Sequence, residues 1–204
     1  MNKFVGERMN PKDIGRKLCF LGFIAVIAAW IVIISSWILN SSWFVFTRDA
    51  FSDFGGANSC CPELYNYGLI IVGAMIVLFS LGCMSCTLNN IELIGWSYIV
   101  LAGVFLALIG IYPSGTRPHV FVSTWFFIQS DISLIIVLSG IYRKIKDNLV
   151  RSALWASILA FPVAFLIEIL VGWPSAAVIE TYGILIIDYA VIIALYAKSR
   201  LREC

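Results

Sequence analysis

Long apolar segments separated by short polar ones make up most of the chain. A helix needs about 20 apolar residues to cross the hydrocarbon layer of a bilayer, and six segments of about that length follow one another in the sequence. We predict membrane-spanning helices at residues 18–39, 66–86, 94–112, 119–141, 152–171 and 176–197. The predicted fold is therefore an all-α bundle of six transmembrane helices.

The basic residues predict how this bundle is oriented. Lysine and arginine in short loops stay on the cytoplasmic side of a membrane. Twelve of the 14 basic residues lie in segment 1–17, between the fourth and fifth spans, or in segment 198–204, and only Arg48 and Arg117 lie on the other side. We expect one membrane domain, residues 18–197, between two basic cytoplasmic tails, in the cell membrane.

Composition supports a membrane protein and excludes several functions. Apolar residues make up 61% of the chain and charged residues 13%, which is incompatible with a water-soluble domain of 204 residues. No dinucleotide-binding, Walker, HExxH or GxSxG motif occurs, and the basic tails are too small for nucleic-acid binding. We expect membrane lipid as a partner, no nucleic acid and no cofactor.

The longest connection, residues 40–64, mixes aromatic and polar side chains. Five aromatic residues alternate with five polar ones, namely Trp43, Phe44, Phe46, Phe51 and Phe54 with Thr47, Arg48, Asp49, Ser52 and Asp53. This pattern is typical of a short interfacial helix with its aromatic side chains toward the acyl chains. The alternative is a lid over a cavity between the spans, which offers Arg48, Ser52 and Asp53 to a head group.

Several stretches of the chain resemble a known family. They comprise residues 43–44, 48–55, 65–73 and 110–113, with His119 shortly after. These stretches resemble the DUF998 family of uncharacterised prokaryotic multi-pass membrane proteins. The resemblance implies a six-span fold, with the Ser52-Asp53-x-Gly55 element, Asn66 and His119 as family features. It implies no activity, cofactor or substrate.

Ionisable residues within the predicted spans form two layers. A helix rises about 1.5 Å per residue, which places Asp131 and Asp188 near the midplane and His119, Glu168 and Glu180 nearer the outer face. Such groups cost about 2.5 to 3.5 kcal/mol each in the hydrocarbon layer, so we expect them to face the bundle interior. Hydrogen bonding between helices without a further role is the alternative.

Enzymatic activity stays undecided at this stage. A hydrolase built on Ser52, His119 and either Asp53 or Glu168 is compatible with their positions at the outer face, but the sequence does not establish these contacts. A zinc hydrolase needs several histidines and the chain has one, so we expect no metal site of that kind.

The adjacent Cys60 and Cys61 lie in the outer loop, where no further cysteine is predicted. A bond between neighbouring cysteines closes a strained ring. Three states are open for the pair: free thiols, bonds to another chain, or metal binding together with His119.

These observations lead to a functional hypothesis with two rivals. We expect an outward-facing polar cavity that binds or handles a lipid or other amphiphile through a set of polar side chains: His119, Asp53, Ser52, Arg48, Glu168 and Glu180. One rival is a small proton-coupled transporter with Asp131 and Asp188 as a proton relay. The other is a structural subunit of a larger membrane complex.

Overall fold

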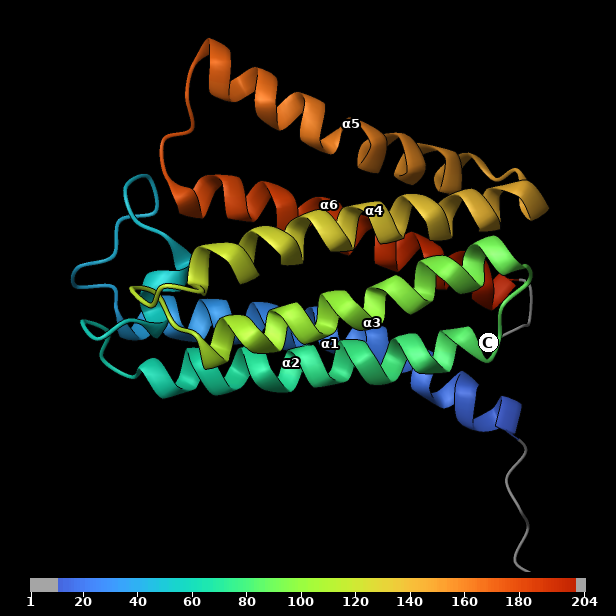
Figure 1. The fold of residues 1–204 in the computed structure, drawn as a ribbon, viewed down its shortest axis with the longest axis horizontal. Coiled ribbons are helices and arrows are strands. Elements are labelled where there is room, and N and C mark those ends of the chain that lie inside the picture. The colour runs from blue at the N-terminus through green and yellow to red at the C-terminus, as the bar shows by residue number, and fades with distance from the viewer. Residues whose placement is uncertain (1–10, 201–204) are drawn as a thin grey trace, which may run out of the picture.

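The computed structural model describes residues 11–200, and this part of the chain is built from helices (Figure 1). Six helices are long and apolar enough to cross a membrane. They are α1 (Pro11–Leu39), α2 (Pro62–Met84), α3 (Asn90–Ile111), α4 (His119–Ile145), α5 (Asn148–Leu170) and α6 (Ala176–Arg200). A short 3-10 helix, η1 (Phe51–Gly55), lies in the longest loop. The prediction of a six-span all-α bundle is confirmed.

Polar residues outside the apolar segments begin or end the helices. The side chains of Asn89 and Asp147 accept hydrogen bonds from the backbone N–H groups of Glu92 and Leu149, at 3.0 and 2.7 Å, and so cap the starts of α3 and α5. Lys146 takes a left-handed conformation, with φ 42°, where α4 ends. These helices therefore extend a few residues past the apolar windows from which they were predicted.

Five of the six helices form a closed ring. Each consecutive pair from α1 to α4 packs side by side, and α6 completes the ring by packing against both α4 and α1. Helix α5 lies outside it and contacts α4 and α6 (Figure 1). We refer to α1, α2, α3, α4 and α6 as the five-helix ring.

Glycine allows two neighbours in this ring to approach closely. A Cβ atom on Gly73 of α2 would lie 2.6 Å from the carbonyl oxygen of Gly103, and one on Gly103 would lie 2.8 Å from that of Gly73. Small residues at such positions let helix backbones come together in a membrane. Because α2 and α3 are in close contact here, the interior space lies on the other faces of these helices.

The two ends of the bundle differ in character. We call one end the capped end, because the long loop of residues 40–61 covers it together with the loops 112–118 and 171–175. We call the other the basic end, and it carries the loops 85–89 and 146–147. Described side chains with positive charge gather at the basic end: Arg16, Lys17, Arg143, Lys144, Lys146, Arg151, Lys198 and Arg200. Arg48 and Arg117 lie in loops of the capped end.

A buried ion pair joins α6 to α3 at the basic end. The ammonium group of Lys198 contacts Glu92 Oε1 and donates a 2.9 Å hydrogen bond to the Cys86 carbonyl, and both charged side chains are fully buried. Glu92 also accepts hydrogen bonds of 2.9 Å from the Trp96 indole and the Leu88 backbone. The carboxylate and ammonium therefore satisfy one another in a site without solvent.

The sequence prediction begins a basic cytoplasmic tail at Lys198, and the structure adds that this residue is part of α6 and buried. Helix α6 continues to Arg200, and Lys198 turns into the protein rather than toward head groups or water. A single lysine at the end of an apolar segment does not show whether it faces outward. Its partner Glu92 is distant in sequence and is brought near only by the packing of the helices.

We predict that Lys198→Met lowers the free energy of unfolding by about 3 to 5 kcal/mol, because it leaves the Glu92 carboxylate buried without its partner. Adding Glu92→Gln should recover part of that loss, since it removes the buried charge and its amide oxygen can still accept the bond of either Trp96 or Leu88. Denaturant unfolding in mixed micelles measures both effects. Arg200→Met is the control, because its ion pair with Asp147 is exposed at the surface and should contribute at most about 1 kcal/mol. Equal effects of the two single variants would contradict the prediction.

Candidate functional site

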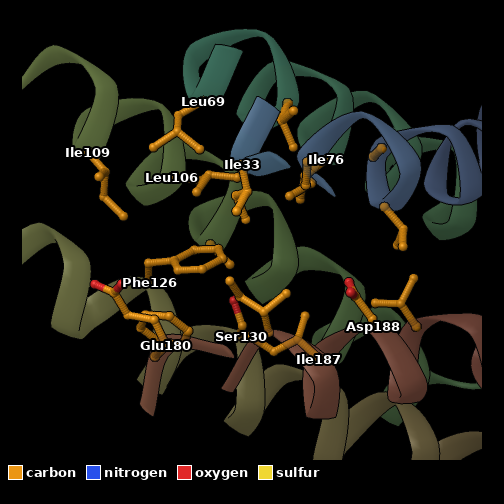
Figure 2. A pocket seen from close by; sticks show the side chains of 18 of the residues that line it. Ile33, Leu69, Ile76, Leu106, Ile109, Phe126, Ser130, Glu180, Ile187 and Asp188 are labelled. Atoms are coloured by element: carbon orange, nitrogen blue, oxygen red, sulfur yellow. The ribbon is translucent and has the colours of Figure 1, made fainter. Parts of the chain in front are cut away.

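A long cavity runs through the interior of the five-helix ring (Figure 2). It contains about 1050 Å³ of space that no protein atom fills, including the part that is open to the surroundings. All five ring helices and η1 contribute to its wall, and α5 does not. Side chains such as Ile33, Leu69, Ile76, Leu106 and Ile187 make this wall mainly apolar (Figure 2).

The polar groups of the wall are few, and the charged ones among them are all acidic. Glu180 and Asp188 lie eight residues apart on α6 and both face the cavity (Figure 2). Hydroxyl groups come from Ser52, Ser123 and Ser130, among others, and no lysine, arginine or histidine among residues 11–200 lines the wall. The cavity therefore combines an apolar interior with carboxyl groups on one helix.

Asp188 links α6 to α1 across the ring. Its Oδ2 atom accepts a 2.7 Å hydrogen bond from the Trp30 indole N–H. The sequence prediction placed Asp188 inside the bundle and paired it only with Asp131, as a proton relay. The indole is a donor that can lie in an apolar wall and still satisfy a carboxyl group.

Glu180 holds η1 in place over the cavity. Its Oε2 atom accepts a 2.8 Å hydrogen bond from the backbone N–H of Phe51, at the start of η1. Asp53 completes the turn, since its carboxylate accepts bonds from the Ala50 backbone at 2.9 Å and from the Ser114 hydroxyl at 3.1 Å. A short helix of five residues is thereby fixed from both sides.

Three of the five aromatic side chains of this loop point into the protein, which differs from the expected interfacial helix. Phe44, Phe51 and Phe54 are 6%, 2% and 0% exposed. The ring centroids of Phe44 and Phe54 are 4.5 Å apart, and Phe54 also packs against Tyr65 of α2 at 5.9 Å. We call Phe44, Phe51 and Phe54 the aromatic plug, because they fill the ring at the capped end and η1 carries two of them.

Asn40 organises the loop that delivers the aromatic plug. This residue is buried, and its side-chain oxygen accepts hydrogen bonds from the Trp43 indole at 3.0 Å and the Cys60 backbone at 2.8 Å. Its amide group donates to the Ser36 carbonyl at 2.8 Å. One side chain therefore joins the start and the end of the loop. Sequence analysis gave it no role, because a lone asparagine after an apolar segment is also an ordinary loop residue.

Arg48 lies away from the cavity. Its guanidinium group forms two 2.8 Å hydrogen bonds with Asp49 and a third with the Trp43 carbonyl, and its side chain is 62% exposed. These hydrogen bonds from Arg48 lower the pKa of Asp49, so the pair stays charged at neutral pH. Asp49 in turn accepts a backbone bond from Val45, and its carbonyl accepts one from Ala177, at the start of α6.

The expected Ser52, His119 and acid group is not assembled as a catalytic triad. His119 Nδ1 donates a hydrogen bond to the Tyr112 carbonyl at 2.8 Å. The Asp53 carboxylate instead accepts a hydrogen bond from the Ala50 backbone at the start of η1. Within residues 11–200 no hydrogen bond joins Ser52 to His119 or His119 to Asp53. Glu168 is exposed near the end of α5 and accepts a bond from the Trp173 backbone, away from the cavity. Of the six predicted ligand-binding residues, Ser52 and Glu180 line the cavity.

The two aspartates of the expected proton relay face different surroundings. Asp188 faces the cavity, but Asp131 is absent from its wall. Asp131 is 5% exposed, and neither of its carboxyl oxygens has a hydrogen-bond partner among the described residues. It lies close enough to Tyr182 of α6 for electrostatic interaction.

Cys60 and Cys61 lie at the surface of the capped end as free thiols, with their sulfur atoms 3.5 Å apart. The hydrogen bond between the two side chains raises the pKa of the Cys61 thiol. In the part of the chain that the structure describes, no group of three or more His, Cys, Asp or Glu side chains is placed to hold a metal ion.

Comparison with known proteins finds one family. The family model described as "Protein of unknown function (DUF998)" matches residues 23–197. No curated protein and no solved structure matches the chain. The matched range contains every residue of the cavity wall except one, Gly22.

We predict that Glu180→Ala exposes the backbone amides of residues 51–53 to solvent. Loss of a hydrogen bond to a charged group should speed their hydrogen–deuterium exchange about tenfold or more. Glu180→Gln should stay near the wild-type rate, because the amide oxygen still accepts from Phe51. Glu168→Ala is the matched control at an exposed acid. Unchanged exchange in Glu180→Ala would show that the aromatic plug holds η1 without this bond.

Proposed function

We propose a function from the cavity itself, because the chain belongs to the DUF998 family of proteins of unknown function, whose description carries no activity. This integral membrane protein binds a lipid or other amphiphile inside the five-helix ring. The observation that carries the proposal is the apolar cavity with a few acidic and hydroxyl groups on its wall. Ligand pockets combine these features in the same way, with a mainly apolar lining and a few polar groups that orient the ligand.

The length and lining of the cavity support an amphiphile over a small polar solute. The wall extends from Ile109 and Glu180, near the capped end, to Phe79 and Val191, well toward the basic end. An alkyl chain fits this elongated apolar space, and its polar group can reach the carboxyl or hydroxyl groups.

The aromatic plug supports entry from the capped end. Residues of η1 form part of the cavity wall, so displacement of this short helix would open the cavity. Toward the basic end the ring is filled by packed side chains, including Trp96, Leu138 and Ala194. We therefore place the entry at the capped end, where a short loop helix and not only the ring helices closes the cavity.

We predict that Leu106→Trp weakens binding of a simple amphiphile, because the larger side chain fills part of the cavity. Tritiated dodecanol is a suitable probe, with the protein in nanodiscs and the signal of empty nanodiscs subtracted. Wild type should bind about one molecule per chain in a saturable manner, and Leu106→Trp should lose at least about tenfold in affinity. Leu101→Trp is the matched control on the same helix, since Leu101 is exposed on the outside of the bundle. Absence of saturable binding to wild type, or equal binding by both variants, would refute the proposed function.

The distribution of charge supports a location in the cell membrane with the basic end in the cytoplasm. Lysine and arginine are retained on the cytoplasmic side of spans, and most described basic residues lie at the basic end. In this orientation the aromatic plug and the entry to the cavity face the outside of the cell.

We predict that a membrane-impermeant maleimide labels the wild-type protein on intact cells through Cys60 and Cys61. Cys60 is exposed, while Cys19, Cys83 and Cys86 are buried. Replacement of Cys60 and Cys61 by serine should abolish the labelling. The control is Asn148→Cys, at an exposed position of the basic end, in a chain that also has serine at positions 60, 61 and 204. It should be labelled only after permeabilisation, and the reverse pattern would invert the proposed orientation.

A further inference from the structure

We infer that the amphiphile is a cation, with an ammonium group beside Glu180 and an apolar chain along the cavity. This inference rests on the proposed function and adds the chemical class of the ligand. It follows from the charge of the wall, the bonding of Glu180 and the aromatic side chains around it.

The charge of the wall has one sign. Glu180 and Asp188 are its ionisable acids, and no basic side chain among the wall residues compensates them. A buried carboxylate requires a positive partner or several hydrogen bonds. Glu92, at the basic end, has such a partner in Lys198. The cavity acids have no basic partner within the wall, and a bound ammonium group would provide one.

The bonding of Glu180 leaves room for a ligand contact. Its Oε2 atom accepts from the Phe51 backbone, while Oε1 has no hydrogen-bond partner among the described residues. Asp188 has its own donor in Trp30. Eight residues of helix separate the two acids by about 12 Å, so a small head group contacts one of them. Glu180, with an unbonded oxygen and a position near the capped end, is the better site.

Aromatic side chains share the capped end of the cavity with Glu180. Phe126 and Glu180 lie together at one end of the view in Figure 2, and Asp188 lies toward the other. Phe51, Phe126, Phe127 and Tyr65 all line the wall, and the ring centroids of Phe126 and Phe127 are 5.1 Å apart. The faces of aromatic rings attract cations, and ammonium groups are recognised in this way. A carboxyl group among aromatic rings suits an ammonium head group and is unfavourable for an anionic one.

Competition against tritiated dodecanol tests the inference. The protein is placed in nanodiscs of digalactosyldiacylglycerol, an uncharged lipid without an amine, and free ligand is corrected with empty nanodiscs. The competitors share one chain and differ in charge: dodecyltrimethylammonium, dodecanol and dodecyl sulfate. For wild type we expect dodecyltrimethylammonium to compete at concentrations at least about tenfold below the other two.

Matched variants assign this preference to one carboxyl group. Glu180→Gln keeps the acceptor for Phe51 and removes the charge, so it should reduce the preference to threefold or less while dodecanol still binds. Glu168→Gln, at the exposed acid of α5, should retain the full preference.

The outcomes separate the two proposals. Saturable dodecanol binding with equal or better competition by dodecyl sulfate overturns the cation inference and leaves the proposed function standing. A cation preference that persists in Glu180→Gln overturns the assignment to Glu180. Failure of both dodecanol and tritiated dodecyltrimethylammonium to bind saturably overturns the proposed function and the inference with it.

Discussion

The cavity lies alongside α6, a helix that polar contacts fix at both of its ends. At the basic end, Lys198 reaches Glu92 and the Cys86 carbonyl in a site without solvent. At the capped end, Ala177 donates to the Asp49 carbonyl, and Glu180 accepts from Phe51. As a whole, α6 packs less extensively against α1 and α4 than α2 packs against its neighbours, and the Trp30–Asp188 bond links it to α1 between its ends. A helix fixed in this way can close the ring without filling its interior.

Glu180 serves two purposes that are coupled by geometry. One oxygen accepts the hydrogen bond that fixes η1, and the same carboxyl group lines the cavity. A ligand that approaches Glu180 therefore acts on the group that holds the aromatic plug in place. Occupancy of the cavity and the position of η1 are linked through one side chain, so binding need not rely on a separate gating element.

The number and approximate extent of the helices could be predicted from the sequence, because the thickness of the hydrocarbon layer sets a minimum apolar length. The neighbours of each helix could not. Phe44, Phe51 and Phe54 are equally compatible with lipid and with a protein core, and only the packed structure shows that they turn inward. Hydrophobicity does not separate these two environments in a membrane protein.

The candidate site was predictable in part for a similar reason. Acids in apolar segments indicate an interior position, which led to Glu180 and Asp188. Their partners are a backbone N–H group of a distant loop and an indole on α1, and neither has a sequence signal. His119, Asp53 and Arg48 were associated with the cavity because they share its depth. Depth along the membrane normal carries no information on direction around a helix, and these side chains form their hydrogen bonds among the loops of the capped end.

The place of α5 outside the ring has a topological consequence. Helices that follow one another through a membrane by short loops alternate in direction. A closed ring with an odd number of members cannot alternate all the way round, so one adjacent pair must run parallel. In this protein that pair is α4 and α6, and α5 is the return crossing that makes it achievable. Helix α5, whose surface is largely exposed, thus serves as a connection that brings the chain back to the capped end before α6 begins.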